Sequence, residues 1–174
     1  MAMRRINNPG AVQQTKDQLV AGTLYNAYLK YSDVQTNGVA GGAASAATWH
    51  TRTLNTEDAD TDNIGSLSSN RITLPAGAYY VHAICPARKV GAHRAKIYNF
   101  TEASDLLNGT NAYSASTDDV VTNAVVSGKF TLSQTSEIEV RHYCVTGAPT
   151  DGLGVVASIS GQPEYYTTID IWRF

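Results

Sequence analysis

The 174-residue chain has few of the residues that mark disulfide-rich, membrane or secreted proteins. Its two cysteines, Cys85 and Cys144, allow one disulfide at most and cannot form a four-cysteine metal site. Both lie in strand-like segments, and we expect buried free thiols in a reducing compartment. No apolar run approaches the roughly 20 residues of a membrane helix, and no apolar core of a secretory signal follows the N-terminal arginines. We therefore expect a protein made in the cytosol that does not contact a membrane.

Charged residues are scarce as well, and neither sign dominates. They make up 16% of the chain, and the formal net charge is −2. Binding of nucleic acid through its phosphates needs clustered lysine and arginine. The densest basic cluster lies inside a strand-like stretch, which indicates a solvated strand face or a subunit contact, and consists of Arg88, Lys89, His93, Arg94 and Lys96. We expect no nucleic-acid partner.

The usual catalytic motifs are missing too. The sequence has no Gly-x-Ser-x-Gly elbow, no His-Glu-x-x-His zinc motif and no glycine-rich phosphate loop. The one metal-like spacing, His142-x-Cys144, places both side chains on one face of a strand. Ile138 and Val140 share that face, so a core-facing pair is the preferred interpretation over a ligand or nucleophile pair. We expect a non-enzymatic protein without a cofactor.

An acidic stretch, residues 56–63, is the best candidate for a metal site. Asp58, Asp60 and Asp62 alternate along it, and carboxylates spaced in this way can converge on Ca²⁺. The sixth position of such a calcium loop would be Asn63 instead of glycine, and the twelfth would be Ser69 instead of glutamate. A solvated acidic loop is therefore the preferred interpretation, and no metal is expected.

The residues that are abundant favour β structure. The chain has ten tyrosines and many short alternating runs of valine, threonine and isoleucine between polar turns. We expect residues 25–174 to form one domain of about eight antiparallel strands, which makes the fold class an all-β antiparallel sandwich. Residues 1–24 form an N-terminal arm whose only helical candidate is residues 11–21. The expected strands are 25–35, 48–55, 64–75, 78–90, 93–101, 120–132, 136–146, 154–160 and 164–174, with a long surface loop at 102–119.

Six segments in a fixed order then indicate a family. They are WHTRTLNT (residues 49–56), IGSLSSN (64–70), ITLPAGAY (72–79), HRAKIYN (93–99), SGKFTL (127–132) and EYYTTIDIW (164–172). This succession resembles the C1q/TNF-like jelly-roll domains of bacteriophage virion proteins, which include fibre tips and head-surface proteins. The resemblance covers residues 25–174 and implies a jelly-roll fold.

The resemblance also implies a homotrimer. In this family the strand equivalent to the last one here lies in the middle of a sheet near a three-fold axis. The last strand of this chain has more large apolar groups than one sheet face requires, so we expect a trimer interface formed by Tyr166, Ile169, Ile171, Trp172 and Phe174. The alternative is that these side chains complete the core of a monomer.

Only about 24 residues precede the jelly roll, without heptads or a Gly-X-Y repeat that could form a fibre shaft. We therefore expect direct attachment through this arm, which contains Arg4, Arg5, Asn7 and Pro9. The first hypothesis is a trimeric capsid decoration or cement protein, bound to the major capsid protein or another virion protein and assembled in the host cytoplasm.

The second hypothesis is a receptor-binding tip of a tail or short fibre, in which residues 102–119 contact a host surface receptor. The third is a carbohydrate-active enzyme or lectin on the same sandwich. No convergent carboxylate pair supports catalysis in that third case.

Overall fold

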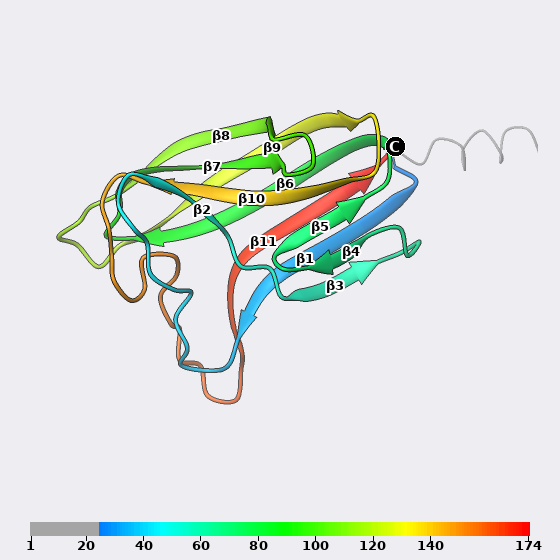
Figure 1. The fold of residues 1–174 in the computed structure, drawn as a ribbon. Helices are drawn as coiled ribbons and strands as arrows, with labels where there is room; N and C mark the ends of the chain where they lie inside the picture. The colour runs from blue at the N-terminus through cyan, green and yellow to red at the C-terminus, as the bar shows by residue number, and fades with distance from the viewer. Residues whose placement is uncertain (1–24) are drawn as a thin grey trace, which may run out of the picture.

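The computed structural model describes residues 25–174, which form two antiparallel sheets packed face to face (Figure 1). One sheet has five strands in the order β3 (Thr56–Asp60), β1 (Ala27–Gln35), β11 (Glu164–Arg173), β6 (Gly77–Arg88) and β9 (Val121–Leu132). The other has the order β4 (Ser66–Ser68), β5 (Arg71–Leu74), β10 (Ser136–Cys144), β7 (Gly91–Asn99) and β8 (Ser104–Ser114), and β2 (Thr48–Thr51) also pairs with β10. The all-β antiparallel sandwich expected from the sequence is confirmed.

The core lies between the two sheets, and the strand period of two explains how it forms. In β6, Tyr79, Val81, Ala83 and Cys85 are fully buried, while the residues between them face outward. Burial of each large apolar side chain contributes roughly 1.5–3 kcal/mol, so the alternating strands supply most of the stability. The other sheet contributes mainly branched side chains, among them Ile72, Leu74, Ile97, Ile138 and Val140.

Eleven strands are present in residues 25–174, where about eight were expected. Residues 56–60 of the acidic stretch form β3 instead of a loop, and residues 104–114 of the expected long loop form β8. Both are edge strands, so each hydrogen-bonds to a neighbouring strand along only one of its two edges. Edge strands often have polar sequences, and these two lack a clear apolar alternation. The expected strand at 154–160 is irregular, and its Ile159 is 61% exposed.

The two ends of the described chain lie together at one end of the sandwich (Figure 1). β1 and β11 are neighbours, Ala27 is opposite Arg173, and the backbone N–H of Asn26 donates to the carbonyl oxygen of Arg173 at 2.5 Å. The long connections, residues 36–47 and 145–163, lie at the other end. The arm, residues 1–24, and its helical candidate lie outside the described residues, but the chain enters the sandwich beside its C-terminus. No helix within residues 25–174 is long and apolar enough to cross a membrane.

Candidate functional site

The outward face of the five-stranded sheet carries a row of aromatic side chains. Tyr28 of β1 lies opposite Trp172 of β11, and Trp172 lies opposite Tyr80 of β6. The ring centroids are 5.5 Å apart in the first pair and 5.8 Å in the second, within the usual range for aromatic contacts. The row continues to Lys129 of β9, whose Nζ lies 4.4 Å from the ring centroid of Phe174. We call these five residues the aromatic row.

A polar row lies two residues farther along the same strands. Lys30, Asp170 and His82 lie opposite one another across β1, β11 and β6. The Tyr28 hydroxyl donates to Asp170 at 2.5 Å, which ties the two rows together. Burial and the neighbouring Asp170 carboxylate raise the pKa of Tyr28, so this hydroxyl stays protonated at neutral pH. The face therefore combines a cation and a carboxylate with a large aromatic surface, and aromatic side chains are enriched in protein interfaces.

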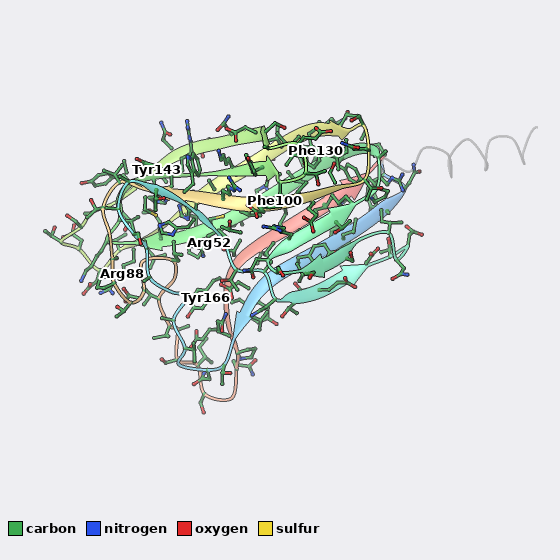
Figure 2. All side chains as sticks on the ribbon, in the orientation of Figure 1. Arg52, Arg88, Phe100, Phe130, Tyr143 and Tyr166 are labelled. Carbon is green, nitrogen blue, oxygen red and sulfur yellow. The ribbon has the colours of Figure 1, made fainter. Side chains whose placement is uncertain are left out.

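The structure separates the five residues predicted for the trimer interface into two groups. Ile169 and Ile171 are fully buried between the sheets, so their side chains belong to the core of one chain and are not available for the predicted trimer interface. Tyr166 is 6% exposed and donates its hydroxyl to the Val39 carbonyl at 2.7 Å, beneath the connections that cover that end (Figure 2). Only Trp172 and Phe174 face outward, because they lie on the other side of the strand or beyond its end.

Sequence reasoning missed Tyr28 and Tyr80, the two aromatic partners of Trp172. Alternation along β1 and β6 separates them from the buried positions, but only the strand order brings the two side by side with Trp172. The four arm residues predicted for attachment, Arg4, Arg5, Asn7 and Pro9, lie outside the described residues. Their role stays a prediction.

The acidic triplet does not converge. Asp60 accepts hydrogen bonds from the backbone N–H groups of Ile64 at 3.1 Å and Gly65 at 2.8 Å, so both carboxylate oxygens stabilise the turn after β3. Asp58 accepts a hydrogen bond from the Ser32 hydroxyl on β1. Asp62 accepts from Thr61 at 3.1 Å. Within residues 25–174 no group of three or more metal-ligating side chains is close enough to hold an ion.

A polar cluster is buried at the loop end of the core (Figure 2). Arg52 is 1% exposed and donates to the Thr167 hydroxyl at 2.6 Å and the Leu153 carbonyl at 2.6 Å. Burial lowers the pKa of its guanidinium, and no carboxylate within the described residues forms an ion pair with it. His93 and His142 are close by: burial, with Arg52 as the second cause, lowers the pKa of His93 to about 4 and of His142 to about 2. Both imidazoles are neutral at pH 7.

The cluster offers no nucleophile. His142 and Cys144 are both fully buried, as predicted for a core-facing pair. Cys85 and Cys144 are free thiols, and burial raises the pKa of each to about 11. Both sulfurs are therefore protonated at neutral pH, whereas nucleophilic or metal-binding cysteine needs the thiolate.

The predicted basic cluster is mostly paired with acidic residues. Arg88, which is labelled in Figure 2, forms ion pairs with Asp119 and Asp151, and these lie on two different loops. Lys89 also pairs with Asp119, at 2.7 Å, and Lys96 pairs with a β8 aspartate at 2.6 Å. The expected solvated strand face is therefore found only in part, because His93 points into the core and Lys96 is 7% exposed. Arg94, unlike Arg88, Lys89 and Lys96, forms no ion pair within residues 25–174.

Comparison with known proteins identifies the fold. No protein-family model matches the chain, and no curated protein matches its sequence. Two crystal structures of murine APRIL, at pH 8.5 and pH 5.0, each align with a TM-score of 0.55, at 9% and 10% identity. Each alignment covers 85% of this chain and 98% of the chain in that crystal structure. The globular domain of zebrafish complement 1qA aligns with a TM-score of 0.47 at 11% identity, over 86% of this chain and 98% of that domain. The chain is thus an all-β sandwich with a C1q/TNF-like jelly-roll fold.

Proposed function

We propose that this jelly roll is a non-enzymatic structural protein of a bacteriophage virion. In this proposal it is a homotrimer that decorates the capsid, is assembled in the host cytoplasm, and is attached through residues 1–24 to the major capsid protein or another virion protein. The six ordered segments that resemble phage virion jelly rolls support the phage assignment, and the fold agrees with them. The neutral buried imidazoles and protonated thiols support a protein without catalysis.

The aromatic row is the observation that carries the proposal. A sheet face that meets water usually presents polar side chains, but here Tyr28, Trp172 and Tyr80 follow one another across three strands, and Phe174 is 41% exposed. Aromatic residues are enriched in the buried centre of protein interfaces. Self-association through this face would remove these rings from water. Lys30 and Asp170 lie on the same face and have opposite charges, so Lys30 of one copy could pair with Asp170 of another.

The position of the row also fits attachment through the arm. The chain enters the sandwich at Tyr25, beside Phe174 and at the same end as the row (Figure 1). If copies associate through this face, their arms start close together. A trimer that binds a particle through three neighbouring arms is held more tightly than a single chain with one arm. Once the first arm is bound, binding of the second and third is intramolecular.

Copy number and location in the virion test the proposal. A reconstruction of the parent particle should show trimers of this fold in many copies over the head, with the arm ends toward the shell. Deletion of residues 1–24 should abolish binding to purified capsids and leave a folded trimer by circular dichroism and sedimentation. Retained capsid binding after this deletion would exclude the arm as the anchor.

A second candidate function is a receptor-binding tip of a tail or short fibre. It is favoured by the side chains displayed far from the arm, since Tyr113 of β8 is 65% exposed and lies near the end opposite to Tyr25. Few copies on the tail, together with loss of adsorption to host cells in a Tyr113→Ala variant, would support this function over decoration.

A further inference from the structure

Four side chains form one row across the outward face of the six-stranded sheet. Trp49 of β2 lies opposite Tyr143 of β10, Tyr143 lies opposite Arg94 of β7, and Arg94 lies opposite Asn111 of β8. Residues that are directly opposite in neighbouring strands share a face of the sheet, so the four side chains are adjacent although their strands are far apart in sequence. We call them the ligand row.

The ligand row lines a hollow. Its volume is about 340 Å³, and Ala92, His93 and Val145 complete its walls. Ligand sites in proteins usually measure roughly 300–1,000 Å³, so this one fits a single ring-sized group. The rings of Trp49 and Tyr143 are 5.4 Å apart and inclined at 60°, which gives the hollow an aromatic corner.

The two polar members of the row have no partner within residues 25–174. Arg94 forms no ion pair there, and neither Arg94 nor Asn111 makes a side-chain hydrogen bond. The cations around them are already paired. Arg141 bonds to Glu139 at 2.6 Å, and Lys96 bonds to Asp105 at 2.6 Å. A guanidinium and an amide are thus left available beside an aromatic corner.

Lys96 also fixes the position of the indole. Its Nζ lies 4.2 Å from the ring centroid of Trp49, a distance typical of a cation–π contact. Because Asp105 neutralises the Lys96 charge, Arg94 is the free positive charge of the hollow. The site is therefore partly preorganised and attracts an anion.

We propose that this hollow binds a sugar ring that carries a carboxylate, such as an acidic residue of a surface polysaccharide. A sugar ring has an apolar C–H face, which packs on Trp49 and Tyr143, and hydroxyls that the Asn111 amide can hydrogen-bond. The planar guanidinium of Arg94 matches a carboxylate with two parallel hydrogen bonds. A neutral sugar would leave Arg94 without its anion, and a simple carboxylate would leave the aromatic corner empty.

The location of the hollow suits a ligand outside the particle. The arm joins the sandwich beside the C-terminus, and Tyr143 lies at the opposite end (Figure 2). A copy attached through its arm would present the hollow outward. The site goes beyond the proposed function, because a decoration protein and a tail protein could both carry it.

The test uses the full chain and methyl glycosides of acidic monosaccharides (glucuronate, galacturonate and N-acetylneuraminate), each compared with a neutral sugar of the same ring and with acetate. At least one acidic glycoside should shift the NMR signals of the Trp49 and Tyr143 rings at millimolar concentration, and the neutral sugar should bind at least about tenfold more weakly. Arg94→Gln should remove this preference, and Trp49→Ala should abolish binding of both sugars.

Arg141→Gln is the matched control, since it removes the same charge from the same face one row away, and it should bind like the wild type. Melting curves confirm that each variant is folded. The proposal would be overturned if the Arg94→Gln variant kept the wild-type preference for the acidic glycoside. It would also be overturned if the NMR shifts appeared away from Trp49 and Tyr143, or if no acidic glycoside bound. Capsid binding by the Trp49→Ala variant reports separately on the proposed function and should be unchanged.

Discussion

Nδ1 of His93 lies 2.9 Å from Nε2 of His142, so the two imidazoles share a single hydrogen inside the sandwich. Nε2 of His93 also bonds to the Thr122 hydroxyl at 2.8 Å, whereas Nδ1 of His142 is buried without a partner in the described chain. A further proton on either ring would place a charge in the core beside the Arg52 guanidinium. Burial and this neighbouring charge therefore favour the neutral form of both rings.

This pair predicts a loss of stability in mild acid. Because the folded-state pKa values, about 4 and about 2, lie below the ordinary value of 6.5, the unfolded chain binds more protons below pH 6.5. The free energy of unfolding should therefore fall as the pH drops from 6.5 to 5, on the order of 2 kcal/mol for each histidine. Urea denaturation measures the decrease, and His93→Gln should make it smaller. A stability that is constant over this range, or a His93 ring that titrates near pH 6.5 by NMR, would contradict the prediction.

If the proposed homotrimer forms through the aromatic row, Trp172→Asp should dissociate it and leave the fold intact. It places a carboxylate in the centre of the aromatic row, where association would have to desolvate it next to Tyr28 and Tyr80. Sedimentation should give the mass of one chain, with an unchanged far-ultraviolet spectrum. Tyr113→Asp is the control, because it makes a similar change on an exposed residue of the other sheet and should remain trimeric. A Trp172→Asp variant that still has the mass of three chains would exclude this face as the interface.

Arg52→Met should destabilise the chain by about 2–4 kcal/mol. Methionine keeps most of the apolar stem but leaves the Leu153 carbonyl and the Thr167 hydroxyl without their donor. The same variant should raise the pKa of His93, because the Arg52 charge is one of the causes that lower it. Urea denaturation and NMR titration measure the two effects. Arg173→Met, at a partly exposed arginine, should cost less than about 1 kcal/mol.

Gly154→Ala should be far more damaging than Gly38→Ala. Both glycines have positive φ angles, +155° and +80°, that other residues rarely adopt, so each variant pays a backbone cost of about 1 kcal/mol. A methyl group at position 154 would also overlap the Tyr166 ring, whereas at position 38 it meets open space. We expect a total loss of about 3 kcal/mol for Gly154→Ala, measured as the urea midpoint. Equal losses in the two variants would show that the Tyr166 ring moves aside without cost.

The sequence was sufficient to predict the strands that have one apolar face and one polar face. The alternation of Tyr79, Val81 and Ala83 marks a half-buried strand, and β6 is found there. β3 and β8 were not predicted as strands, because they are edge strands with polar sequences in which alternation carries little information. The irregular 154–160 segment was predicted as a strand from its apolar residues, although Ile159 is exposed.

Functional positions were harder to predict than strands. Alternation along residues 48–55 puts Arg52 on the face opposite Trp49, but it does not show that Arg52 lies in the core. The groups that accept its hydrogen bonds come from residues 153 and 167. The ligand row likewise needs the register of four strands, which no local pattern contains. Local sequence determines which way a side chain points, and only the pairing of distant strands determines its neighbours.

The hydrogen bond between Asn26 and Arg173 shows that the two ends of the jelly roll are adjacent. A short linker from Phe174 to Tyr25 could join the ends, and new termini could be opened in the connection after β8, at residues 115–120, where the side chains are largely exposed. In such a circular permutant the arm would be removed from the aromatic row and placed at the far end of the sandwich. The proposed anchoring through the arm and the proposed self-association through the aromatic row could then be tested separately.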